Sequence, residues 1–90
     1  MVVHVTFNDG SNPWIAFNLD KKQVIKTVNR FRKNCGDNIC IDIYVGDLKI
    51  EHDYNNIWFI RCDNKAASFR RLGNAINFCE KYNSKGDQEK

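Results

Sequence analysis

Apolar and polar residues alternate along five segments of the chain, a pattern typical of β-strands that bury one face. The first two segments, residues 2–8 and 14–19, flank a loop rich in Asn, Asp, Gly and Pro, so they predict a β-hairpin. Turn-forming residues also separate the later segments, which therefore predict a three-stranded meander. These strands are residues 39–45, 48–52 and 57–62, with turns at residues 46–47 and 53–56.

Two further segments repeat their apolar residues at intervals of three and four, the spacing of one face of an α-helix. The first is expected to begin after Asp20, because Asp20 and Gln23 have the spacing of a capping box, and to end at Gly36. The second is expected to begin after Asp63 or Asn64 as its cap. The two apolar stripes are Val24, Val28, Phe31 and Cys35, and Phe69, Leu72, Ile76 and Cys79.

These elements predict a two-layer α+β fold of order ββαβββα, with a largely antiparallel five-stranded sheet and both helices on one face. The length of 90 residues fits a single domain, residues 1–83, and the polar residues 84–90 are expected to form a frayed tail. The helices would then cover one apolar face of the sheet. The strand residues expected on that face are Val3, Val5, Phe7, Ile15, Phe17, Ile39, Ile41, Ile43, Leu48 and Ile50.

The strand at residues 57–62 is apolar on both faces, and its more apolar set, Trp58, Ile60 and Cys62, is expected to face the helices. The opposite face of the sheet then has no helix over it and is expected to carry aromatic side chains. Such a surface indicates an interface, unless the tail or the loop at residues 8–13 folds over it. The predicted partner-binding residues are Trp14, Tyr44, Ile57, Phe59 and Arg61.

The net charge of +3 is distributed unevenly along the chain. Residues 20–36 carry six basic residues and one acidic residue, whereas residues 37–63 carry two basic and six acidic residues. The helical layer is therefore expected to be basic, and basic side chains of this kind suit contacts with nucleic-acid phosphates. Lysine-rich helix faces that interact only with water are the alternative. The residues of the nucleic-acid hypothesis are Lys22, Lys26, Arg30, Lys33, Arg70 and Arg71.

The sequence contains none of the short motifs of nucleotide-binding loops, serine hydrolases or zinc proteases, so we expect no enzyme activity and no cofactor. A small enzyme with an unrecognised site is the third hypothesis. Its candidate residues are His4 with Cys40, or Asp42 with Glu51 or Asp53. The four cysteines lack the paired spacing of a zinc site, so we predict no metal and expect reduced thiols.

No run of about 18 apolar residues is present, and the chain begins without an apolar leader, so we predict a cytoplasmic protein with no membrane contact. Residues encoded by AT-rich codons, such as Asn, Lys, Ile, Phe and Tyr, are plentiful. With the small size, this composition suggests by analogy a phage or mobile-element protein. The primary hypothesis is a non-catalytic module that binds another protein or a second copy of itself. It would act as an inhibitor or regulator of a host nucleic-acid-handling or defence complex, and no small-molecule substrate is predicted.

Overall fold

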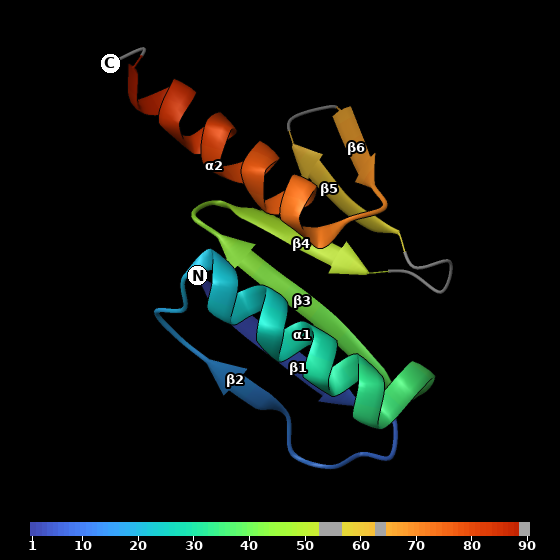
Figure 1. Cartoon of the computed structure of the whole chain (residues 1–90). Helices are drawn as coiled ribbons and strands as arrows, with labels where there is room; N and C mark the ends of the chain where they lie inside the picture. Colours follow the sequence, from blue (N-terminus) through green and yellow to red (C-terminus); the bar gives the residue numbers. More distant parts are fainter. Residues whose placement is uncertain (53–56, 63–64, 89–90) are drawn as a thin grey trace.

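The computed structural model describes residues 1–52, 57–62 and 65–88, which form a six-stranded antiparallel sheet and two α-helices (Figure 1). The strand order across the sheet is β2-β1-β3-β4-β5-β6. The predicted α+β class is confirmed, but the predicted number of five strands is wrong. The elements are β1 (Val2–Phe7), β2 (Trp14–Ala16), α1 (Lys21–Cys35), the 3₁₀ turn η1 (Gly36–Asn38), β3 (Ile39–Val45), β4 (Leu48–His52), β5 (Trp58–Cys62), β6 (Lys65–Phe69) and α2 (Leu72–Gln88).

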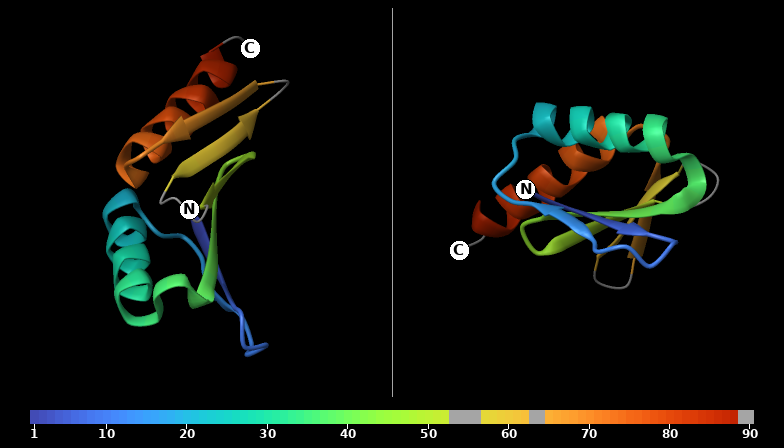
Figure 2. Two further views of the ribbon diagram at one scale, coloured as in Figure 1. Left: turned by 90° about the vertical axis from the view of Figure 1, so that its right-hand side faces the viewer. Right: turned by 90° about the horizontal axis from the view of Figure 1, so that it is seen from below.

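Both helices lie on the same side of the sheet, as predicted, and the views in Figure 2 show no described element over the other side. α1 lies over the half of the sheet that contains β1 and β3, and α2 packs against strands of the other half. Between the layers the apolar side chains of both helices meet one face of the strands. The core consists of Val3, Val5, Val24, Val28, Ile41, Ile43, Val45, Leu48, Ile50, Trp58, Ile60, Leu72, Ala75, Ile76 and Cys79.

The boundaries of α1 follow from its capping residues, as the sequence predicts. The Asp20 carboxylate accepts a hydrogen bond from the Gln23 backbone N–H at 2.8 Å, and the Gln23 side-chain oxygen accepts one from the Asp20 backbone N–H at 2.9 Å. This capping box satisfies two of the backbone donors that a helix start leaves without an intrahelical acceptor. At the other end Gly36 adopts a φ of 57°, and its N–H donates to the Arg32 carbonyl oxygen.

The sixth strand is the main departure from the predicted topology. Residues 65–69 were expected to start the second helix, but they form β6, which pairs with β5 from Trp58↔Phe69 to Cys62↔Lys65. α2 therefore begins only at Leu72. Phe69 still packs on α2, with its ring centroid 5.5 Å from that of Phe78, but it does so from the sheet. The predicted caps Asp63 and Asn64 and the predicted turn at residues 53–56 lie outside the described residues.

The orientation of β2 is opposite to the predicted one. Trp14 and Ala16 lie across from the core residues Val5 and Val3, so they face the helices. The Trp14 ring packs on Phe31 of α1, with ring centroids 4.9 Å apart. Ile15 and Phe17, which were expected in the core, are 46% and 65% exposed. The assignment of Trp14 to the open face was therefore wrong, because Phe31 offers this large ring an aromatic contact that only the helix face provides.

α2 extends into the segment that was expected to be a frayed tail, since its helical backbone continues to Gln88. Its first two turns lie against α1, where Gly73 is close to Ile25 and Lys21 and where the Lys21 ammonium donates a hydrogen bond to the Asn77 side chain. Within the described residues, neither helix combines the length and the apolar composition that a membrane span requires.

Candidate functional site

The predicted partner-binding site lies on the side of the sheet opposite the helices. On this side, the pairing of neighbouring strands arranges the side chains in rows. Cross-strand partners share a face. One row runs through His4, Asp42, Glu51 and Phe59, because His4 pairs with Asp42, Asp42 with Glu51, and Glu51 with Phe59. A parallel row joins Val2, Tyr44 and Lys49. We call this side the open face.

Three of the four exposed large hydrophobic side chains among the described residues come from β2, from β3 and from the residue that directly follows β2. Ile15 lies across from His4, and Tyr44, which is 39% exposed, lies across from Val2. Phe17 directly follows β2, and the β1–β2 register does not continue past Val3↔Ala16, because Met1 exchanges backbone hydrogen bonds with Leu19 and Asn18 adopts a φ of 58°. We call Val2, Ile15, Phe17 and Tyr44 the open-face patch. It replaces the predicted cluster around Trp14 with a different set of apolar residues.

Ile15 and Phe17 could not be recognised as exposed from the sequence, because residues 14–19 offer two apolar sets of similar strength. Trp14 and Ala16 alternate with Ile15 and Phe17, so a period of two cannot decide which pair is buried. The deciding contact is the Trp14–Phe31 pair, which joins residues 17 positions apart. A signal was present in Phe31, the aromatic residue among the apolar residues of α1, but using it requires knowing that α1 lies over β1 and β2.

Charged side chains border the patch along β3 and β4. The Lys49 ammonium lies 3.2 Å from the Glu51 carboxylate, and Lys49 is also the cross-strand partner of Tyr44. The hydrogen bond that Lys49 donates to the Glu51 carboxylate, and then the negative charges of Glu51 and Asp42, raise the pKa of Lys49. Lys49 therefore offsets two carboxylates that face each other across β3 and β4, where like charges are destabilising. An apolar centre with a charged border is typical of protein interfaces.

The remaining predicted partner-binding residues lie at the other end of the open face. Phe59 is half-buried, and Arg61 is exposed with its guanidinium 5.8 Å from the centre of the Phe59 ring. Trp58, Ile60 and Cys62 face the helices, so the predicted orientation of this strand is confirmed. Ile57 directly precedes β5 and is half-buried. These residues are separated from the open-face patch by the polar pair Asp42 and Glu51.

The basic residues of the nucleic-acid hypothesis divide into two groups. Lys22, Lys26, Arg30 and Lys33 are exposed and belong to α1, whereas Arg70 and Arg71 are exposed on the connection between β6 and α2. None of the six lies on the open face. The basic residues and the open-face patch therefore occupy different surfaces of the protein.

The candidate catalytic residues that the structure describes, His4, Cys40, Asp42 and Glu51, lie on strands β1, β3 and β4. His4 lies across from Asp42, whereas Cys40 lies across from Thr6, so His4 and Cys40 are diagonal neighbours on the open face. Asp53 lies outside the described residues. Among the residues that are described, no three side chains of His, Cys, Asp or Glu form a group that could hold a metal ion. All four cysteines are free thiols.

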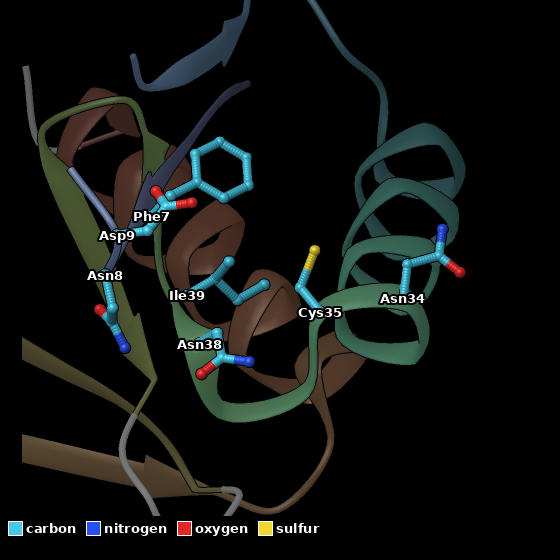
Figure 3. A pocket seen from close by; sticks show the side chains of 7 residues that line it. All are labelled: Phe7, Asn8, Asp9, Asn34, Cys35, Asn38 and Ile39. Carbon is cyan, nitrogen blue, oxygen red and sulfur yellow. The ribbon is translucent and has the colours of Figure 1, made fainter. Parts of the chain in front are cut away.

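A pocket of about 530 Å³ lies elsewhere, between the C-terminal end of α1 and the end of β1 (Figure 3). Phe7, Cys35 and Ile39 contribute its apolar and thiol lining, and Asp9 contributes a carboxylate. That carboxylate already accepts hydrogen bonds from the backbone and hydroxyl of Ser11, which lower the pKa of Asp9. Asn8 is likewise used by the loop, because its backbone N–H donates to the Asn38 carbonyl oxygen at 2.9 Å. The polar groups thus mainly hold the loops together.

The open-face patch is therefore the candidate site that combines exposed apolar side chains with a charged border. Its residues come from β1, β2 and β3 and from the segment that follows β2. Comparison of the chain with protein-family models, with curated protein sequences and with solved structures found no match.

Proposed function

We propose that this protein is a non-catalytic protein-binding module whose contact surface is centred on the open-face patch. The observation that carries the proposal is the exposure of Ile15, Phe17 and Tyr44, which are 46%, 65% and 39% exposed, with Ile15 and Tyr44 on the side of the sheet that neither helix covers. Large apolar side chains in one exposed patch favour association, because burying them removes apolar surface from water. Aromatic residues such as Phe17 and Tyr44 are also frequent in interface centres.

The border of the patch supports a protein partner over a small molecule. Ligand pockets are concave, whereas this surface is one side of a sheet bordered by Lys49 and Glu51. Charged residues around an apolar centre increase the rate of association and select among partners. The role predicted from composition, an inhibitor or regulator of a host nucleic-acid-handling or defence complex, remains a prediction about the identity of that partner.

The test replaces the patch without disturbing the core. A triple variant Ile15→Thr, Phe17→Thr and Tyr44→Thr keeps residues that favour strands while removing the apolar surface. Mass in solution over a range of concentrations shows whether a second copy is the partner, and affinity purification from the native host shows whether another protein is. We expect the triple variant to lose the association that the unmodified protein shows.

Cys40→Ser is the matched control, because Cys40 is exposed on the same face but outside the patch. It should retain full association. The proposal is wrong if the triple variant binds as the unmodified protein does. It is also wrong if the unmodified protein stays monomeric and retains no protein at all.

A further inference from the structure

A row of cations runs along the side of α1 that faces away from the sheet. Lys22, Lys26, Arg30 and Lys33 are all exposed, and at 100° per residue they fall within roughly 80° of one another around the helix axis. The core residues Val24 and Val28 lie on the opposite side of the same helix. We call the four cations the α1 stripe. It extends over eleven residue steps, or about 16 Å of helix.

Within residues 1–52, 57–62 and 65–88, no ion pair neutralises the charge of this stripe. α1 contains no acidic residue between Lys21 and Cys35. In the described part of the chain the ion pair found is Lys49–Glu51, on the open face, and the four cations of the stripe take part in none. The Arg30 guanidinium contacts the Phe31 ring, with 6.0 Å to its centre, which steadies the side chain without cancelling its charge. A uniform row of this kind attracts a polyanion.

The surroundings of the stripe favour nucleic acid over other polyanions. A helix that binds membranes inserts its apolar face into the lipid, but the apolar face of α1 is already buried against the sheet through Val24 and Val28. An acidic protein would usually need apolar or aromatic contacts beside the charges. The other exposed residues of α1 are instead polar, namely Gln23, Asn29 and Asn34. Phosphate contacts need only such cations and hydrogen-bond donors.

We propose that the α1 stripe binds duplex DNA, with its lysines and arginine on the phosphates that border the major groove. An α-helix with its side chains is about 10–12 Å across, and the major groove of B-form DNA is about 12 Å wide. The deep, narrow major groove of double-stranded RNA does not admit a helix in this way. α1 is the outermost element on its side of the protein, so its solvent face is accessible to a duplex (Figure 2).

This site is separate from the proposed protein-binding surface. The open-face patch lies on the uncovered side of the sheet, and the stripe lies on the outer side of the helical layer. DNA and a protein partner can therefore be bound at the same time, and each site can be tested in the absence of the other.

The experiment measures binding of the full chain to a fluorescent duplex of about 20 base pairs by anisotropy, from about 25 to 200 mM KCl. Four phosphate contacts predict a slope of about −3 to −4 in a plot of log K against log salt. The double variant Lys26→Ala, Arg30→Ala should reduce the size of that slope by about 2 and weaken binding at low salt about tenfold or more. Circular dichroism confirms that the variant remains folded.

The matched control is Lys65→Ala, Lys81→Ala, which removes the same charge from exposed positions outside the stripe. It should keep the slope of the unmodified protein, and so should the triple variant of the open-face patch. The proposal is overturned if the duplex is not bound at the lowest salt, or if the control loses as much affinity as the stripe variant. Tighter binding to an RNA duplex or to vesicles containing phosphatidylserine would also overturn it.

Discussion

The side chain of Asn83 donates a hydrogen bond through Nδ2 to the backbone oxygen of Val45 at 3.0 Å, which ties α2 to the end of β3. The next residue, Gly46, has a φ of 60° and occupies the first position of the two-residue turn between β3 and β4. A β-carbon added at Gly46 would overlap the Asn83 amide. The turn and the helix are thus shaped for each other, since glycine provides both the positive φ and the space.

Asn83→Ala should lower the free energy of unfolding by about 0.5–1.5 kcal/mol, because it removes a partly buried hydrogen bond. Gly46→Ala should lower the free energy of unfolding by about 1–3 kcal/mol, because alanine disfavours the positive φ and its β-carbon would overlap the Asn83 side chain. The double variant should lose less free energy of unfolding than the sum of the two single losses, because Asn83→Ala removes the side chain that the added β-carbon would overlap. Urea unfolding followed by tryptophan fluorescence measures all three values.

Gly10→Ala is the control for this cycle. Gly10 has a φ of 84°, but no atom lies within 4 Å of the position of its added β-carbon. It should therefore show the cost of the positive φ alone. Equal costs at Gly10 and Gly46, together with additive effects of Gly46→Ala and Asn83→Ala, would contradict the close fit between the turn and α2.

Trp14→Ala should lower the free energy of unfolding by about 1–3 kcal/mol, because the ring packs half-buried against Phe31. Ile15→Thr, one residue away on the open face, should change it by no more than about 0.5 kcal/mol. Thermal or urea unfolding of the two variants decides the orientation of β2. The opposite ranking would show that Ile15, and not Trp14, faces the helices.

Cys79 should resist thiol reagents at pH 8 in the folded protein, whereas the exposed Cys40 should react quickly. Burial raises the pKa of the Cys79 thiol from 9.0 to about 11, so little thiolate is present at that pH. Mass spectrometry of peptides after timed labelling measures both rates. Labelling of Cys79 as fast as that of Cys40 would contradict its position in the core.

The raised pKa of Cys79 also predicts a loss of stability in alkaline solution. The unfolded chain loses the Cys79 proton near pH 9, whereas the folded protein keeps it until about pH 11, so the free energy of unfolding should fall as the pH rises between these values. Cys79→Ala should reduce that fall when unfolding curves are compared at pH 8 and at about pH 10. An unchanged dependence on pH would show that other groups cause it.

Lys49→Met should lower the free energy of unfolding by about 0.2–1 kcal/mol at neutral pH, because it leaves Asp42 and Glu51 opposite each other without a cation. The pKa of Lys49 is raised, so its contribution is complete below its ordinary value of 10.5 and is lost as the pH rises through the raised value. Adding Asp42→Asn to the Lys49→Met variant should restore most of the lost free energy of unfolding. If the double variant is no more stable than Lys49→Met, repulsion between the carboxylates is not the cause.

Local patterns in the sequence determined the elements whose signals agree with one another. α1 has a capping box at Asp20 and Gln23, one apolar stripe and a glycine at its end, and all three appear in the structure. The turn at Gly46 and the burial of Trp58 and Ile60 follow from turn chemistry and alternation in the same way. The basic character of the outer face of α1 was also evident, because helical spacing separates its cations from its core residues.

Tertiary structure decided the two elements whose local signals were weak or balanced. Residues 65–69 contain two alanines and favour a helix locally, but they complete the sheet by pairing with β5, and this pairing satisfies backbone groups that the edge of β5 would otherwise expose. Residues 14–17 are apolar on both faces. Contact with Phe31 holds Trp14 half-buried on the helix side, whereas Ile15 and Phe17 are exposed. Sequence alone therefore indicated that an uncovered sheet face exists. Which residues occupy it depended on a contact between a strand and a helix that are distant along the chain.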